Sequence, residues 1–403
     1  MILRIKYIDQ ITPFIGKPVI KVITGMRRIG KSTFLKMIMN TLQEQGIDKN
    51  LIVYINKESL EFDDIQNYMH LNRYITAISQ KTKKKLYIFI DEIQEISEWE
   101  KAILSFFSND VADIYISGSN AHLFSEELAT LLSGRYVTIP IYPLTFKEFL
   151  LFRGSKIENV DNEKEFSNYV RFGGFPGIHM LDFHEEIIFQ YINSIFNTIL
   201  LKDVTKRHKI RNVAQLERIT KFIFDNCGNI ISAKKISDYL KSQRASVTVD
   251  TIQNFLQYLQ SAFLIFKTSR FDIKGKRHLE FLEKYYMGDI GLRHGFIGYR
   301  DSDISGILEN IVYLELLSRG YKVSVGKLSN LEIDFIAEQQ GNREYFQVCY
   351  LLASKDTENR EFKPLELLKD NFPKTVISLD KNWGNNRNGI LRSNLIEWLM
   401  VDD

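Results

Sequence analysis

The sequence predicts an α/β protein with a parallel-sheet core, followed by a helical, winged-helix segment and a second α/β region near the C-terminal end. Two observations support this fold class. Short apolar runs alternate with amphipathic helical stretches over residues 19–153, and unbroken apolar strands in such an alternation are typical of a parallel sheet covered on both faces. A similar alternation begins near residue 304. With 403 residues, the chain is long enough for two or three domains.

The expected first domain spans residues 1–153 and contains strands and helices in regular order. Its expected strands are 19–24, 51–55, 86–90, 113–117 and 136–141, and its expected helices are 31–45, 65–79 and 99–107. The helices are expected because their apolar residues recur at a spacing of three or four, which places them on one face.

The expected second domain, residues 154–300, is a helical lid with a basic winged helix-turn-helix. The glycine-rich run 173–177 indicates a hinge or a domain boundary. Helical patterns follow over 185–225, then two short helices at 232–242 and 248–259 and a strand pair at 263–278. Two short helices followed by a basic hairpin favour the winged-helix interpretation.

The third region, residues 301–403, begins with a helix over 304–319 and continues with strands at 321–325, 332–337 and 344–350. It is the expected third domain.

Charge is unevenly distributed along the chain. The net charge is only +3, but residues 202–277 contain 16 Lys and Arg against 6 Asp and Glu. Such a segment favours a polyanion partner, so double-stranded DNA is a candidate for residues 232–277; a solvated basic surface is the alternative. No apolar run approaches the length of a membrane span and no signal-peptide pattern is visible, so a cytoplasmic protein without a membrane partner is expected.

The strongest motif is a glycine loop between the first strand and the first helix. It matches the pattern G-x-x-x-x-G-K-[ST] at every fixed position. Glycines let main-chain N–H groups converge on phosphate oxygens, and the helix N-terminus adds positive potential. Lys31 is expected to reach the β- and γ-phosphates, and Ser32 to ligate Mg²⁺. The predicted nucleotide-binding residues here are Gly25, Met26, Arg27, Arg28, Ile29, Gly30, Lys31, Ser32 and Thr33.

Two later strands end in polar residues. Strand 86–90 is followed by Asp91, a candidate for the Mg²⁺ shell, and by Glu92, a candidate for polarising an attacking water. Strand 113–117 is followed by Ser119 and Asn120, either of which could face the γ-phosphate or that water; a simple polar turn is the alternative.

These motifs, in this order and spacing, resemble those of AAA+-type P-loop ATPases. The chain is more narrowly similar to a bacterial and archaeal group of AAA+-like ATPases with a C-terminal domain of unknown function. The residues that carry the narrower match are the glycine loop, 91–94, 118–120, 132–135, 143–146 with Glu148 and Phe149, and 173–176.

The resemblance implies ATP and Mg²⁺ as cofactors and hydrolysis of ATP to ADP and phosphate. It assigns Ser119 or Asn120 to the sensor position. Arg135 is similar to an arginine that serves the γ-phosphate of a neighbouring subunit, which implies a homo-oligomer; a surface arginine in a turn is the alternative. Two other functions stay open. One is a nucleotide-gated DNA-binding switch with negligible turnover, and the other is an ATP-dependent nuclease.

The C-terminal region resembles the PD-(D/E)xK nuclease fold, whose carboxylates hold Mg²⁺ while a lysine orients the attacking water. Glu309 and Asp334 match two acidic positions, but Gln347 stands where a carboxylate is needed and Cys349 where the lysine is needed. An amide is a weak Mg²⁺ ligand and a thiol supplies no cation. A nuclease-derived fold that has lost catalysis is therefore expected.

Overall fold

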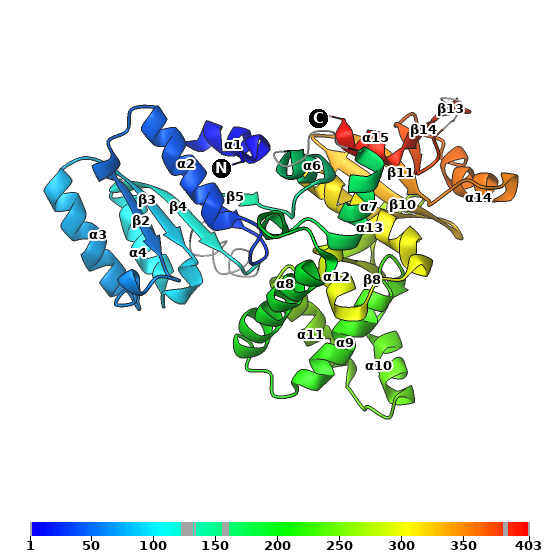
Figure 1. The fold of residues 1–403 in the computed structure, drawn as a ribbon, viewed down its shortest axis with the longest axis horizontal. Coiled ribbons are helices and arrows are strands. Elements are labelled where there is room, and N and C mark those ends of the chain that lie inside the picture. The colour runs from blue at the N-terminus through cyan, green and yellow to red at the C-terminus, as the bar shows by residue number, and fades with distance from the viewer. Residues whose placement is uncertain (1, 122–131, 133, 155–160, 382–385, 402–403) are drawn as a thin grey trace. The chain divides into compact units, whose positions relative to one another are not determined.

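The computed structural model describes residues 2–121, 132, 134–154, 161–381 and 386–401 (Figure 1). The chain forms two compact units. The first contains Met1–Ile141 together with Ser261–Phe263, and the second contains Tyr142–Gln260 and Leu264–Asp403. None of the helices in the described part of the chain is both long and apolar enough to cross a membrane.

The first unit is built on a five-stranded sheet in the order β2-β3-β4-β1-β5. Every neighbouring pair is parallel, which confirms the predicted α/β class and the P-loop NTPase fold of this core. The strands are β1 (Ile20–Thr24), β2 (Ile52–Asn56), β3 (Leu86–Asp91), β4 (Ala112–Gly118) and β5 (Tyr136–Pro140). Because all five run the same way, the residues that follow β1, β3 and β4 meet at one edge of the sheet.

Helices cover this sheet in the way that the apolar patterns predict. α3 (Tyr68–Thr82) and α4 (Trp99–Ser108) share one hydrophobic core with the sheet, and α2 (Lys31–Glu44) packs on β3 and β4. α1 (Ile5–Ile11) precedes β1. α3 begins three residues later than expected, because the side chain of Asn67 accepts hydrogen bonds from the N–H groups of Met69 and His70 and caps the helix there.

The second unit begins with a helical region that contains several short helices. They are α6 (Phe146–Gly154), α7 (Asn162–Phe172), α8 (Glu185–Thr198), the π-helical η7 (Ile199–Lys206), α9 (Val213–Asp225), α10 (Ala233–Ser242), α11 (Val249–Ser261) and α12 (Ile290–Ile297). The predicted short helices at 232–242 and 248–259 correspond to α10 and α11.

The second unit also contains a nine-stranded sheet in the order β13-β14-β12-β11-β10-β9-β7-β8-β6. Its strands are β6 (Ile230–Ile231), β7 (Ile265–Asp272), β8 (Arg277–Met287), β9 (Lys322–Leu328), β10 (Leu331–Gln339), β11 (Asn342–Val348), β12 (Lys374–Ser378), β13 (Asn386–Arg387) and β14 (Ile390–Asn394). Its other helices are α13 (Ile304–Ser318), α14 (Lys355–Glu366) and α15 (Leu395–Met400). The basic hairpin β7–β8 thus shares a sheet with the C-terminal strands, across residue 300. The domain boundary expected there stays a prediction.

The glycine run after α7 is fastened to the start of α12. Asp289 caps α12 and its buried carboxylate accepts hydrogen bonds from the N–H groups of Gly174 (2.7 Å) and Gly291 (2.8 Å). A Cβ atom on Gly173 would lie 2.3 Å from Oδ1 of Asp289. The small residues are therefore needed for this close approach.

The end of α11 belongs to the first unit. The main-chain carbonyl of Ser261 accepts a hydrogen bond from the N–H of Ala121, 2.8 Å away. Ala121 directly follows Asn120 at the end of β4.

Candidate functional site

The glycine loop adopts a conformation that its two glycines make possible. Gly25, after β1, has a φ of +142°, and a Cβ atom there would lie 2.3 Å from the carbonyl oxygen of Ile141. Gly30 has a φ of +102° and caps α2. Met26 and Ile29 are buried and anchor the loop, whereas Arg28 is exposed. Because α2 begins at Lys31, the N–H groups of its first turn have no acceptor within the helix and face an anion-binding position.

Lys31 and Glu92 lie next to each other at the edge where β1 and β3 end. The Lys31 ammonium nitrogen is 3.4 Å from Oε1 of Glu92, and it donates a hydrogen bond to the carbonyl of Met26 at 3.1 Å. Both side chains are more than nine-tenths buried. The structure thus brings the predicted phosphate-binding lysine and the predicted catalytic carboxylate together.

Glu92 is held by groups on three segments. Burial alone would raise the pKa of its carboxyl group, but the charges of Lys31 and Arg27 and hydrogen bonds from Gln94 and Ser119 lower the pKa below 4.5. Ser119 donates to Oε2 of Glu92 at 3.1 Å, and Gln94 donates to the same oxygen. Glu92 is therefore ionised. Gln94 was not among the predicted site residues, although it stands two positions after Glu92.

Asp91 faces the same region and is fully buried. Its two carboxylate oxygens accept hydrogen bonds from the hydroxyl groups of Ser117 and Tyr54, the latter at 3.1 Å. Ser32, at the start of α2, is partly exposed. A carboxylate and a hydroxyl group are oxygen donors of the kind that Mg²⁺ prefers, so these two residues fit a magnesium ion that arrives with a nucleotide.

The remaining predicted residues of this region take up different positions. Arg27 is buried and pairs with Glu58 after β2, at 2.6 Å. Asn120 is buried beyond the end of β4, next to Ser119, and Thr33 is exposed on α2. Of these two neighbours, Ser119 donates a hydrogen bond to Glu92 at 3.1 Å.

Arg135 lies away from this cluster. It comes directly before β5, and its carbonyl oxygen accepts a hydrogen bond from the N–H of Ile20, the first residue of β1. Its guanidinium group lies 5.8 Å from the centre of the Phe107 ring. The strands β1 and β5 are parallel, so they begin at the same end of the sheet. Arg135 precedes β5 and Gly25 follows β1, so the two residues lie at opposite ends of the strands, roughly 16 Å apart along five strand residues. Arg135 does not face the glycine loop of the same chain.

Known proteins resemble the chain over most of its length. It is 38% identical over 400 residues to an uncharacterized protein of Haemophilus influenzae, covering 99% of both chains. It is 35% identical to the uncharacterized protein MJ1544 of Methanocaldococcus jannaschii, covering 86% of this chain and 78% of that protein. Residues 17–150 match the AAA domain family, and residues 163–303 match a domain of unknown function (DUF8612).

The chain belongs to the same family as these two proteins, and its residues 17–150 are an AAA domain. Among solved structures, the Walker-type ATPase PABY2304 of Pyrococcus abyssi is similar with a TM-score of 0.49 and 12% identity, covering 73% of this chain and 95% of that one.

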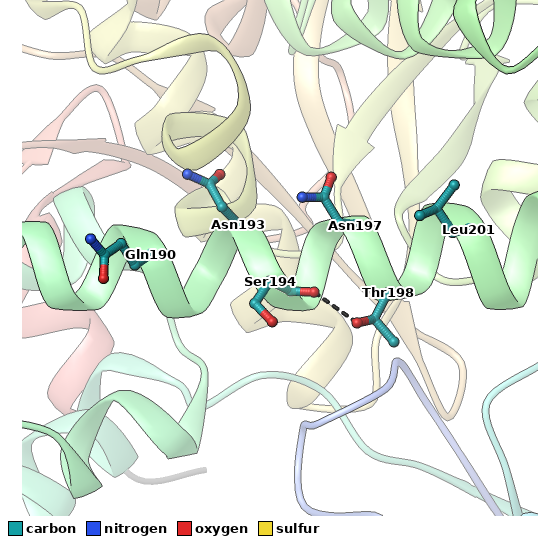
Figure 2. Close-up of a pocket in the computed structure, with 6 residues that line it drawn as sticks. All are labelled: Gln190, Asn193, Ser194, Asn197, Thr198 and Leu201. Atoms are coloured by element: carbon teal, nitrogen blue, oxygen red, sulfur yellow. Dashed lines mark hydrogen bonds between the residues drawn. The ribbon is translucent and has the colours of Figure 1, made fainter.

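Outside the AAA domain, a hollow of about 540 Å³ follows one face of α8 and the start of η7 (Figure 2). It is lined by Gln190, Asn193, Ser194, Asn197, Thr198 and Leu201. The hydroxyl group of Thr198 donates to the carbonyl of Ser194 at 2.8 Å. Its lining consists of amide and hydroxyl side chains and one apolar side chain, none of them charged.

The basic segment exposes only part of its charge. Lys241 and Arg244 at the end of α10, and Lys274, Lys276 and Arg277 at the turn between β7 and β8, are exposed. Two other basic residues of the candidate range 232–277 are less available: Lys267 pairs with Glu283, and Arg270 is buried.

In the C-terminal region, the structure brings Glu309 and Asp334 to one ammonium group, that of Lys284 on β8. Lys284 was not among the predicted site residues, because it lies 50 residues upstream of Asp334 and in no motif.

Proposed function

We propose that the AAA domain binds ATP with Mg²⁺ and hydrolyses it to ADP and phosphate. The observation that carries this proposal is the pair Lys31 and Glu92, held 3.4 Å apart where the glycine loop and the end of β3 meet. A phosphate-binding ammonium group next to an ionised, buried carboxylate is what phosphoryl transfer to water requires.

The triphosphate would lie along the N–H groups of the loop and the first turn of α2. The Lys31 ammonium group would leave the Met26 carbonyl and the Glu92 carboxylate and would contact phosphate oxygens instead. Glu92 would then orient a water molecule and accept its proton at Oε1, the oxygen that Lys31 leaves, while the water oxygen bonds to the γ-phosphorus. The bond from that phosphorus to the bridging oxygen breaks, which leaves ADP and phosphate.

Mg²⁺ would be held by the Ser32 hydroxyl and the Asp91 carboxylate, and when bound it neutralises charge on the phosphate oxygens. Ser119, already hydrogen-bonded to Glu92, would position the base. Arg135 would act on the nucleotide of an adjacent subunit, since it is at the far edge of its own sheet. This role requires a homo-oligomer.

Binding of ATP to the Lys31→Ala variant tests whether the glycine loop is the nucleotide-binding site. Titration calorimetry with ATP and Mg²⁺ should give heat of binding for the wild type and none for the variant. Lys36→Ala is the matched control, because Lys36 is an exposed lysine on the same helix. Tight binding of ATP by Lys31→Ala would refute the proposal.

A second proposed function is binding of double-stranded DNA, favoured by the exposed basic side chains on α10 and at the β7–β8 turn. Two helices followed by a strand pair, as in α10, α11, β7 and β8, fit a winged helix. Ammonium and guanidinium groups that replace phosphate counter-ions give affinity that falls with salt.

A salt-dependent mobility shift tests DNA binding. Reversing the charges of Lys241, Arg244, Lys274 and Lys276 should abolish the shift, whereas reversing those of the exposed Lys49, Lys81, Lys83 and Lys84 in the first unit should leave it unchanged. An equal effect of both sets would contradict the assignment. A shift that depends on ATP without any release of phosphate would favour a nucleotide-gated switch over a turnover enzyme.

A further inference from the structure

Three carboxylates from two elements surround one buried lysine in the second unit. The ammonium nitrogen of Lys284 is 2.8 Å from Glu309 on α13. It is 2.7 Å from Glu332 and 3.9 Å from Asp334, both on β10. The Lys284 side chain is only 3% exposed, so its charge is neutralised almost entirely by these acids.

Two of the acids, Glu309 and Asp334, also accept hydrogen bonds. The hydroxyl group of Tyr286, two residues after Lys284, donates to Oε1 of Glu309 at 2.5 Å. The main-chain N–H of Val348 donates to Oδ2 of Asp334 at 2.8 Å. Burial, and then the charge of Glu309, raise the pKa of Asp334, while Lys284 opposes that rise. The same three acids raise the pKa of Lys284 although burial lowers it, so Lys284 stays charged.

Gln347 and Cys349, which stand at the positions that a nuclease-like site would need, do not complete a metal site. The amide oxygen of Gln347 accepts from the N–H of Asp334 at 3.4 Å, and its amide nitrogen donates to Glu361 at 3.0 Å. Burial raises the pKa of the Cys349 thiol, which keeps it protonated. In the described part of the chain, no group of three or more His, Cys, Asp or Glu side chains is arranged to hold a metal ion.

We propose that Lys284 is a built-in counter-ion that takes the place of a divalent cation among Glu309, Glu332 and Asp334, so that this region binds no catalytic metal and cleaves no nucleic acid. Both a metal ion and an ammonium group offset the repulsion among converging carboxylates, but only the metal ion can activate a water molecule. Lys284 also joins the basic hairpin to α13 and β10, because it lies on β8.

The substitution Lys284→Met tests this proposal, because it removes the ammonium group and keeps most of the side-chain volume. Mn²⁺ binding is measured by titration calorimetry on the nucleotide-free full chain, together with the melting temperature with and without Mn²⁺. The wild type should bind no Mn²⁺ at the cluster. Lys284→Met should melt at a lower temperature, bind one equivalent of Mn²⁺ and recover much of the lost melting temperature when Mn²⁺ is added.

Two matched variants complete the design. Lys267→Met removes a lysine of the same hairpin that pairs with one carboxylate, and it should gain no Mn²⁺ site. Lys284→Met with Asp334→Asn should lose the site gained by Lys284→Met. Should Lys284→Met alone not fold, the double variant Lys284→Met/Glu309→Gln should fold, because it removes one charge of each sign.

Four results would overturn the proposal. The first is one equivalent of Mn²⁺ bound by the wild type and lost in Asp334→Asn, and the second is a folded Lys284→Met that binds none. The third is failure of Lys284→Met/Glu309→Gln to fold when Lys284→Met also fails. Cleavage of plasmid DNA by the wild type in Mg²⁺ or Mn²⁺, lost in Asp334→Asn, would also contradict it.

Discussion

The ammonium nitrogen of Lys31 lies 3.4 Å from Oε1 of Glu92. The residue expected to bind phosphate and the residue expected to activate water are therefore paired with each other. The charge of Lys31 is one cause of the low pKa of Glu92. In the proposed mechanism Lys31 turns to a phosphate group, so Glu92 would lose that partner and become a stronger base. Nucleotide binding and activation of the base would then be linked.

Glu92→Gln should bind ATP but hydrolyse it roughly 100-fold or more slowly, because general bases contribute about that factor. The amide keeps the shape of the side chain and removes its ability to accept a proton. Single-turnover phosphate release at saturating ATP measures the effect. Glu95→Gln, an exposed neighbour, should behave as the wild type. Equal rates for Glu92→Gln and the wild type would show that Glu92 is not the base.

Gly25→Ala should abolish ATP binding while the rest of the chain stays folded. The added Cβ atom would lie 2.3 Å from the carbonyl oxygen of Ile141 and 2.5 Å from Cδ1 of Ile29, so the loop must move. Gly46→Ala is a suitable control, since Gly46 also has a positive φ but has open space at the Cβ position. Calorimetry and circular dichroism on both variants separate loss of the loop from general unfolding.

Arg135→Ala and Lys31→Ala subunits should each be inactive and should regain activity when mixed. In a mixed oligomer, an intact Arg135 from one subunit can face an intact glycine loop from another. A trans-acting arginine contributes on the order of 10³-fold or more to turnover. Absence of any recovery over a range of mixing ratios, with oligomers verified by light scattering, would favour a surface role for Arg135.

Asp289→Asn should change how stability depends on pH. Burial raises the pKa of Asp289 from 3.8 to about 6, despite hydrogen bonds from the N–H groups of Gly174, Leu292 and Gly291. Because the folded pKa is raised, this group stabilises the fold below pH 4, and that contribution is lost as the pH rises through 6. The shift corresponds to roughly 3 kcal/mol.

Urea unfolding of the wild type and Asp289→Asn between pH 4 and 7 measures this contribution. The free energy of unfolding of the wild type, minus that of Asp289→Asn, should fall between pH 4 and pH 7. The same comparison between the wild type and the exposed Asp182→Asn should show no such trend. A difference that is constant over this range would contradict the assignment.

The candidate nucleotide site could be predicted from the sequence because its parts are local. The glycine loop can be recognised from its two fixed glycines and its lysine alone. The strands that precede Asp91 and Ser119 must end on the same side of a parallel sheet, which brings these residues together. The alternation of apolar runs fixed the five strands to within a residue or two. The start of α3 was misplaced only because a side-chain cap, at Asn67, decides where the helix begins.

Contacts between distant segments were not predictable in the same way. Lys284 reaches acids 25 to 50 residues away in the chain, and nothing in its own neighbourhood marks it. Asp289 likewise fastens a glycine run 115 residues before it. Such partners are set by how strands and helices pack, and a single sequence carries no local signal for them.

The hydrogen bond from Ala121 to Ser261 bears on how the protein can be divided. Ending the chain after Ile141 would leave out Ser261–Phe263, which completes the first unit, and would leave the N–H of Ala121 without its acceptor. A shortened chain prepared for crystallisation or assay would therefore lack a main-chain hydrogen bond of the first unit. Work on isolated pieces should retain Ser261–Phe263, either on the intact polypeptide or as an added peptide.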